Sequence, residues 1–497
     1  MHKLSGFICA GLLASMPLLS QRTLSLEETL VLAREHSIQA MLNKNEFLEA
    51  YWNYKMHRAK MLPNLYLGMT PVSYDKSFYQ IYNFVDEKDE FREMYKLKST
   101  AGLALDQNIG ITGGRVSLSS GLQRIQNLRS ATDSSGISGD TYYSSVPFMV
   151  SYHQPLFAHN PYKWERILEP KKYEQARKEL MQDLQDLNVE AVQMYFAVLK
   201  AQNHVLMAEA EVAATDTLLR IGQTRQEIAD INREDLLNLE LNHNNARVKL
   251  LQYKEEQRKA EDRFRLFTGL SKGEAFALLP PGNPPFIVLS PDDALILAHL
   301  YNPDIFMLEI DRLEAQKNSD KAVKEYRFNM DMVFRYGINQ SAEDFSGAYK
   351  DPLDRQIAEV SLQMPILDWG RKKRAVALAK SRQEIVEARS SMELQTIEQE
   401  ITNLAYQYAL KDLETRSSAR ADSIAGLSYL LALERFRSGE AGILDLDNAQ
   451  NKKVAARQQL LDTRERFWTL FYQLQSSTLY DLRLKKELEM DVEQYVE

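Results

Sequence analysis

The chain has 497 residues, of which 44% are apolar, so it can bury a sizeable core, and disorder of the whole chain is excluded. Its 61 basic and 69 acidic residues give a formal net charge of −8. No basic excess is left for a phosphate backbone, so we do not expect nucleic acid to be a partner.

Residues 1–20 have the pattern of a secretory signal peptide. A basic start precedes an apolar run from Leu4 to Leu19, and we expect cleavage after Ser20. The only cysteine, Cys9, falls inside this run, so the mature protein is expected to contain no thiol. A lipid anchor on Cys9 is the alternative, but Ile8 stands before it where a small residue would be expected.

After the signal, the sequence contains no run of about 18 apolar residues, so no transmembrane helix is predicted. In lipid every backbone polar group needs a partner within the protein. If the mature chain crosses a membrane, it must therefore do so as a barrel of strands.

The next segment, about 26–61, is expected to be helical and leads into a region with the two-residue period of strands. Such alternation leaves one face apolar and the other mostly polar, which is typical of membrane barrel strands. An amphipathic sheet on a soluble core remains the alternative reading. The apolar positions of this period are Leu65, Leu67, Met69, Val116, Leu118, Phe148, Val150 and Tyr152, and in a later region Met330, Met332, Phe334, Tyr336, Val360, Leu362 and Met364.

Two very long helical runs follow the first strand region. The first carries apolar residues at alternating spacings of four and three, the pattern of a coiled-coil seam. A helix of about 55 residues would be roughly 80 Å long, too long for a compact globule. The seam consists of Leu180, Leu184, Leu187, Ala191, Met194, Val198, Ala201, Val205, Ala208 and Val212, and the second half repeats it with Leu394, Ile397, Ile401, Leu404 and Tyr408.

The sequence also contains an internal duplication. Leu24-Ser25 reappears as Leu289-Ser290 and Leu48-Glu49-Ala50 as Leu313-Glu314-Ala315, each displaced by 265 positions. Further on the displacement falls to 210, as in Asp235-Leu236 and Asp445-Leu446. The first copy therefore holds an insertion of 55 residues, around 73–143, which reads as either an extra hairpin or a long extracellular loop.

The linker between the copies is predicted at Pro280–Pro285, since its prolines interrupt both helix and sheet. We therefore divide the chain into a signal peptide at 1–20, a first repeat at 21–280 and a second repeat at 281–497. Each repeat has the same order of a helical segment, strands and two long helices.

Two motifs in the second copy resemble those of the TolC-like outer membrane efflux proteins, also called outer membrane factors. The run Val360–Arg371, with its Pro-Ile-Leu-Asp-Trp-Gly-Arg ending, is similar to the strand-to-helix junction of that family. Arg435–Gly439, which leads into Asp445–Gln450, resembles its helix-hairpin tip. The first copy departs from the pattern, because Ala158-His159-Asn160-Pro161 replaces the Asp-Trp-Gly-Arg turn.

The resemblance implies a fold that is mainly α with β, in which duplicated coiled-coil helical hairpins carry strands that contribute to a trimeric transmembrane β-barrel. It implies a homotrimer in the cell outer membrane, in contact with its lipid, with a helical tunnel in the periplasm. The implied partners are a periplasmic adaptor (membrane fusion) protein and an inner-membrane transporter, in a tripartite efflux or type I secretion system.

The resemblance also implies a periplasmic gate at the hairpin tips, where acidic side chains line the constriction. The candidates in the tip segments are Asp230, Asp235, Glu440 and Asp445. Converging carboxylates from three chains would attract cations and help to select what passes. The alternative is that Asp235 and Asp445 only stabilise the positive ends of the helices that they begin.

No enzyme site is expected. The eight histidines show no metal-binding spacing and Thr112-Gly113-Gly114 lacks the lysine of a phosphate-binding loop, so we expect no cofactor, metal or catalytic residue. The sequence favours a passive duct for export of small molecules or proteins and does not indicate the substrate. A soluble periplasmic coiled-coil scaffold is the alternative.

Overall fold

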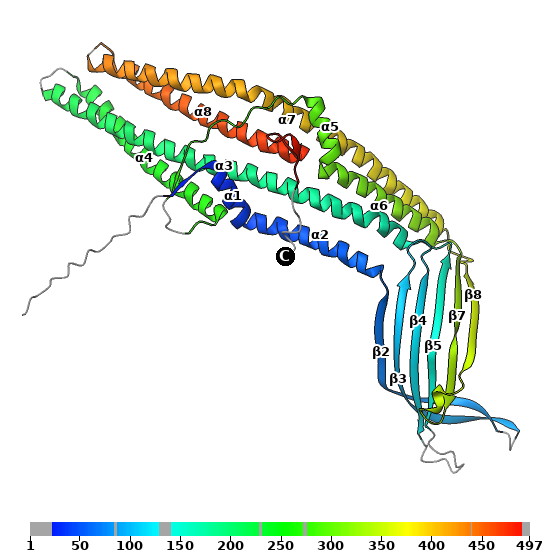
Figure 1. Cartoon of the computed structure of the whole chain (residues 1–497). Helices are drawn as coiled ribbons and strands as arrows, with labels where there is room; N and C mark the ends of the chain where they lie inside the picture. The colour runs from blue at the N-terminus through cyan, green and yellow to red at the C-terminus, as the bar shows by residue number, and fades with distance from the viewer. Residues whose placement is uncertain are drawn as a thin grey trace, which may run out of the picture. The chain divides into compact units, whose positions relative to one another are not determined.

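The computed structural model describes residues 22–83, 87–128, 141–227, 231–271, 276–438 and 440–489. The predicted signal peptide at 1–20, including Cys9, lies outside these ranges. In the part described, the chain consists mainly of long helices together with one large sheet (Figure 1), which agrees with the predicted combination of helical hairpins and strands. None of the described helices is both long and apolar enough to cross a membrane.

The first copy contains four helices and four long strands. In chain order they are α1 (Leu26–His36), α2 (Ile38–Lys60), β2 (Asn64–Asn83), β3 (Lys88–Asn108), β4 (Arg115–Leu128), β5 (Thr141–Leu156), α3 (Pro161–Glu227) and α4 (Arg233–Thr268). The short strands β1 (Arg22–Leu24) and β6 (Phe276–Leu278) flank this series and pair with each other in parallel.

Each helix of the second copy has the same length as its counterpart in the first copy. The second copy contains α5 (Pro291–Tyr301), α6 (Pro303–Glu325), β7 (Asn329–Ala342), the short 3-10 helix η1 (Gly347–Tyr349), β8 (Leu353–Gln363), α7 (Arg371–Arg437) and α8 (Ile443–Thr478). Helices α1 and α5 both have 11 residues, α2 and α6 have 23, α3 and α7 have 67, and α4 and α8 have 36. Strands β9 (Tyr480–Asp481) and β10 (Lys486–Glu487) follow. The predicted duplication is therefore visible in every helix.

Each expected first helix is broken into two. The break lies at Ser37 in the first copy and at Asn302 in the second, where the backbone is extended with ψ of 146° and 122°. Ser37 accepts a hydrogen bond from the Ala40 N–H, at 3.0 Å, so its side chain caps the second helix. Pro303 follows Asn302 and disfavours helical backbone at that residue. Neither break was predicted.

The six long strands form one antiparallel sheet with the order β2-β3-β4-β5-β7-β8 (Figure 1). Strands β2 and β8 form its edges, and each pairs on one side only among the described residues. The second copy contributes two of the strands and the first contributes four, so the inserted segment forms an additional pair of strands, β3 and β4. The open question between a hairpin and a long loop is thus answered in favour of the hairpin.

The inserted hairpin turns at residues 109–114, where Gly113 adopts a left-handed φ of 78°. Side chains of the first copy hold this turn. Gln154 donates to the Thr112 carbonyl at 2.9 Å, and Asn160 donates to the carbonyls of Gly110 and Ile111 at 3.1 Å each. The insertion is therefore fastened to the end of β5 and the start of α3.

By its contacts the chain divides into two compact units, each built from both copies. One unit contains residues 47–177 and 303–396, and the other contains the residues up to 46, 178–302 and those from 397 onwards. The predicted repeat boundaries, 21–280 and 281–497, describe sequence copies and remain a prediction.

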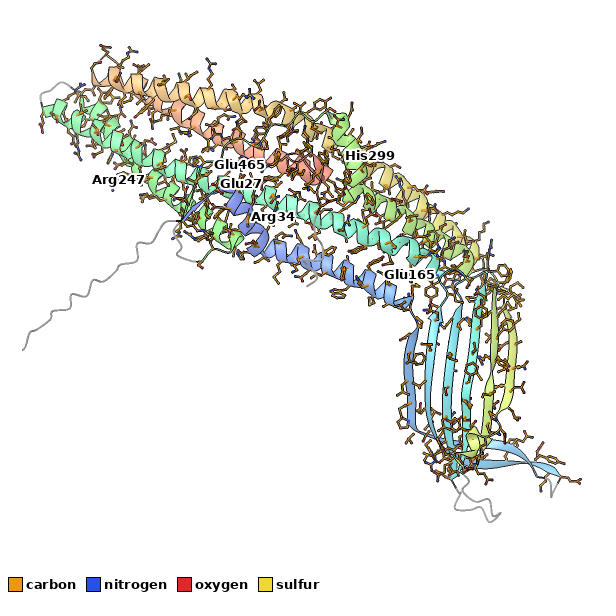
Figure 2. All side chains as sticks on the ribbon, in the orientation of Figure 1. Glu27, Arg34, Glu165, Arg247, His299 and Glu465 are labelled. Atoms are coloured by element: carbon orange, nitrogen blue, oxygen red, sulfur yellow. The ribbon has the colours of Figure 1, made fainter. Side chains whose placement is uncertain are left out.

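The first unit contains the sheet and the helix ends that adjoin it. Lys60 donates to both carboxylate oxygens of Glu165, labelled in Figure 2, at 2.8 and 3.0 Å. The rings of Tyr54 and Tyr173 stack with centroids 4.8 Å apart. These contacts join α2 to the start of α3 within one copy.

The second unit contains α4 and α8 together with α3 from residue 178 onwards and α7 from residue 397 onwards. The predicted seam of α3 is buried from Leu180 to Ala208, apart from Met194, which is half-buried, and in the second copy Ile401 and Tyr408 are buried. The linker packs against this unit, since Trp468 donates to the Gly282 carbonyl at 2.9 Å and Tyr408 donates to the Pro285 carbonyl at 2.9 Å.

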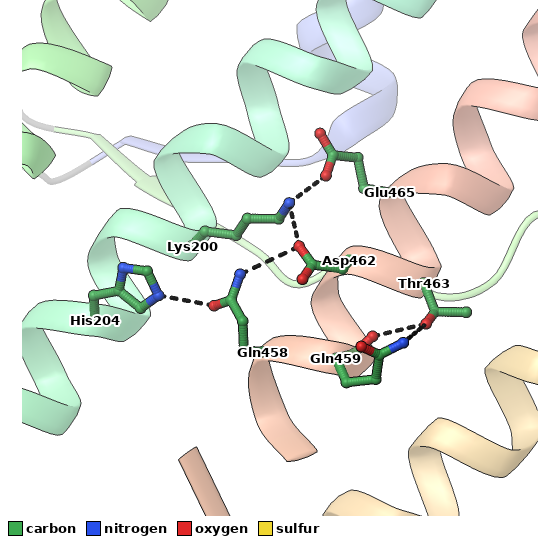
Figure 3. Close-up of polar contacts among 7 residues, drawn as sticks. All are labelled: Lys200, His204, Gln458, Gln459, Asp462, Thr463 and Glu465. Atoms are coloured by element: carbon green, nitrogen blue, oxygen red, sulfur yellow. Dashed lines mark hydrogen bonds and ion pairs between the residues drawn. The ribbon is translucent and has the colours of Figure 1, made fainter. Parts of the chain in front are cut away.

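A polar cluster joins the two copies inside this unit (Figure 3). The Lys200 ammonium on α3 bridges the carboxylates of Asp462 and Glu465 on α8, at 2.5 Å to Asp462. His204, one turn further along α3, hydrogen bonds Gln458 at 2.8 Å. Burial alone would lower the pKa of Lys200, but the hydrogen bonds to both carboxylates outweigh it and hold the pKa above its ordinary value.

Replacing Lys200 with Met should destabilise the protein by about 1.5–3 kcal/mol, because two partly buried carboxylates lose their shared counter-ion. Lys254→Met is the matched control, since Lys254 pairs with Glu209 in an exposed position and such pairs contribute about 1 kcal/mol or less. Denaturant midpoints of the detergent-solubilised proteins measure both. Equal midpoints for the two variants would show that the Lys200 cluster does not hold the copies together.

Candidate functional site

The sheet has one continuous apolar face. Register places Leu65, Leu105, Leu118, Val150 and Tyr336 in a single row that crosses five strands. Paired residues share a face and successive residues alternate between faces, so the predicted apolar positions all lie on this side, except Met364, which follows the end of β8. Most of these side chains are exposed, Leu65, Tyr336 and Val360 among them.

The opposite face of the sheet is mostly polar. The adjacent row runs through Asn64, Asp106, Ser117, Ser151 and Arg335. A contiguous exposed apolar surface next to a polar one marks a protein or membrane contact, because water disfavours such a patch. The sheet thus presents one apolar face and one mostly polar face.

At the strand-to-helix junction of the second copy, Asp368 lies three residues before the first residue of α7. Its carboxylate accepts hydrogen bonds from the N–H groups of Gly370 at 2.9 Å and Lys372 at 3.0 Å. These bonds lower the pKa of Asp368 from its ordinary value. Trp369 and Gly370 adopt left-handed backbone, with φ of 52° and 76°, so the Asp-Trp-Gly-Arg motif encodes a turn with a helix cap.

The first copy makes the same junction with different residues. Asn160 accepts a hydrogen bond from the Lys163 N–H at 3.2 Å, and Pro161 is the first residue of α3, a position that suits its fixed φ. The amide of Asn160 simultaneously holds the turn of the inserted hairpin. The departure from the motif is therefore explained by the insertion, a role that the sequence did not reveal.

Three of the four candidate gate residues lie among the described residues, next to the turns of the two hairpins. Asp235 and Asp445 are the third residues of α4 and α8, at equivalent positions of the repeat, and both side chains are exposed. Asp445 accepts a hydrogen bond from the Gly442 N–H at 3.2 Å, whereas the Asp235 N–H donates to Asn232 Oδ1 at 2.7 Å. Both aspartates thus occupy helix N-termini, as the alternative reading expected.

Glu440 lies in the turn that precedes α8, with its side chain exposed and its N–H bonded to the Arg435 carbonyl at 2.8 Å. Asp230 lies outside the described residues. The structure therefore brings Glu440 and Asp445 into one tip and places Asp235 in the other, all with free access to solvent.

The described part of the chain contains no group of three or more His, Cys, Asp or Glu side chains arranged to hold a metal ion. The two features that remain are the apolar sheet face and the acidic hairpin tips.

Solved structures share this fold. The chain has a TM-score of 0.66 to the CmeC outer membrane channel of Campylobacter jejuni, with 13% identity over 95% of this chain and 88% of that one. The outer membrane protein VceC of Vibrio cholerae gives 0.61, with 12% identity over 93% and 97%. A membrane protein of Pseudomonas aeruginosa gives 0.63, with 15% identity over 91% and 90%. No curated protein matches the sequence.

The family comparison covers most of the chain. The model of the family described as outer membrane efflux protein matches residues 115–270 and 297–478, one block in each copy. The match confirms the expected resemblance and agrees with a transport role in which the protein performs no chemistry. The chain belongs to the outer membrane efflux protein family.

Proposed function

We propose that three copies of the chain form a passive duct through the outer membrane, with their strands in one barrel and their helices in a periplasmic tunnel. The continuous apolar face of the sheet carries this proposal, because it provides a lipid-facing surface across all six strands. The polar face would then line a wet lumen. Proteins with the same fold are described as outer membrane channels, which supports a channel role.

The duct would be one component of a larger export system. A channel without an energy source needs a partner that drives transport, so we propose that a periplasmic adaptor and an inner-membrane transporter engage it, in a tripartite efflux or type I secretion system. Small molecules and proteins are both compatible with a passive duct. A soluble periplasmic scaffold would instead leave the apolar face in water, where a large exposed patch favours aggregation.

Met332→Arg should strongly reduce the amount of protein that inserts in the outer membrane. Met332 lies on the apolar face, where an arginine costs up to about 2–4 kcal/mol near the middle of the bilayer. Val333→Arg is the control, since Val333 lies on the polar face opposite Glu359. Quantifying both variants in outer-membrane fractions tests the orientation, and equal yields would contradict it.

We further propose that Asp235, Glu440 and Asp445, together with Asp230, line the closed periplasmic end. The described members of this set are exposed at the hairpin tips. Carboxylates from three chains at one constriction would concentrate cations there.

Asp445→Asn keeps an acceptor for the Gly442 N–H and removes the charge, so it should lower the preference for cations in planar bilayers. Asp445→Ala removes both the charge and the acceptor that stabilises the tip turn, so it should loosen the closed end and raise the conductance. Asp235→Ala should raise the conductance as well, because it shortens a side chain that would line the constriction from the other tip. Unchanged conductance and selectivity in all three variants would remove these residues from the gate.

A further inference from the structure

We propose that the contact between the two copies inside one chain is repeated between chains, so that β8 of one chain pairs with β2 of the next in a defined register, and the closed sheet contains six strands from each chain. Each unpaired edge strand, β2 and β8, is thus paired with another copy of this chain. This inference rests on the proposed trimeric channel and specifies its interface.

Equivalent positions of the repeat differ in exposure in the way that this proposal requires. Leu168 on α3 is 1% exposed, whereas its counterpart Leu378 on α7 is 52% exposed. Phe196 is fully buried, and its counterpart Tyr406 is 60% exposed. The second copy covers this surface of α3 in the first copy. The equivalent surface of α7 in the second copy would be covered only by another chain.

The same difference occurs on the surface that would receive α7. Leu461 on α8 is 7% exposed and adjoins Asp462, which pairs with Lys200 of α3, whereas its counterpart Leu251 on α4 is 70% exposed. Helix α7 exposes an apolar row at heptad spacing, and α4 exposes a shorter row of the same kind. Their members are Leu378, Ile385, Met392, Tyr406, Leu413 and Leu427 on α7, and Leu237, Leu241, Val248 and Leu251 on α4.

Helix contacts within the chain show how these surfaces would meet. Helix α3 of the first copy contacts α8 of the second through Lys200 and Asp462, and it contacts α6 through Lys171 and Glu309, at 2.8 Å. By the repeat, α7 of one chain would contact α4 and α2 of the next. Two unpartnered a/d-type rows that meet in this way form a coiled-coil seam.

The strand register follows from the same argument. Inside the chain, β5 pairs with β7 through Leu156–Met330 and His153–Val333. Strand β8 corresponds to β5 with a displacement of 210, and β2 corresponds to β7 with a displacement of 265, as Pro365 with Pro155 and Asn329 with Asn64 illustrate. The predicted pairs between chains are Ile366–Leu65, Met364–Leu67, Gln363–Gly68, Leu362–Met69 and Ser361–Thr70.

Side-chain chemistry agrees with this register. Leu362, Met364 and Ile366 each meet an apolar residue of the apolar face, while Gln363 and Ser361 meet Gly68 and Thr70 of the polar face. A slip by one residue would bring apolar and polar faces together along the whole edge. Ile366, which is 94% exposed, would extend β8 by three residues, as Leu156 does in β5.

The inserted hairpin then sets the width of the channel. Three copies of a six-stranded sheet close as 18 strands, whereas copies with only two strands per repeat would close as 12. Barrel diameter grows roughly linearly with strand number, so β3 and β4 widen the barrel by about one half. The interface is head-to-tail, and such an interface gives a closed ring when the rotation closes.

Paired cysteines test the register. Gly68→Cys with Gln363→Cys should give disulfide-linked trimers after mild oxidation of outer membranes, since opposite residues of paired strands have Cβ atoms about 4.5–5.5 Å apart. Space is open around a Cβ at Gly68. Ser361→Cys with Thr70→Cys should behave in the same way. The mismatched pair, Gly68→Cys with Ser361→Cys, is displaced by two residues and should not link, nor should either cysteine alone.

A cryo-electron microscopy map of the unmodified detergent-extracted protein should show 18 strands. Linking only in the mismatched pair, no linking in trimers that form normally, or a barrel of another strand number would overturn this inference while leaving the proposed channel intact. Absence of any trimer from the outer membrane would instead refute the proposed function itself.

Discussion

Lipid cannot hydrogen bond to a peptide backbone, and this constraint governs how the sheet can be used. Strands β2 and β8 each leave one row of N–H and C=O groups without a strand partner in the described chain. Such an edge is too costly in a bilayer and prone to unspecific pairing in water. The proposed channel therefore requires other chains at these two edges, which makes assembly a condition of its insertion.

The duplication meets this requirement with one type of contact. The interface between the first and second copies already combines a strand pair, β5 with β7, and a helix contact, α3 with α8. An added strand pair in one copy changes the circumference of the proposed barrel but leaves the copy-to-copy contact unchanged. Asn160 and Gln154 fasten the added turn to the junction without altering the length of any helix. The width of the proposed barrel can thus vary while the helix lengths stay the same.

The periodic patterns of the sequence predicted the features that depend on one face of a strand or helix. The two-residue period identified the apolar side of the sheet, and the heptad spacing from Leu180 to Ala208 identified a buried seam, because an apolar surface on one side of an element imposes a period on its sequence. Single residues with local roles were missed. The helix break at Ser37 depends on the hydrogen bond of a single side chain. Asn160 caps α3, as Asp368 caps α7, and it also holds the turn of the inserted hairpin, which no periodic pattern predicts. The proposed gate role of Asp445 depends on neighbouring chains, which the pattern of a single sequence does not describe.

The proposed channel requires a trimer that is closed in the outer membrane. Fractionation of expressing cells, followed by gel electrophoresis of the detergent-extracted outer membrane with and without heating, detects such a trimer. We expect a band of three chains in that fraction, which falls to a single chain on heating. A soluble periplasmic monomer would refute the channel and favour a coiled-coil scaffold.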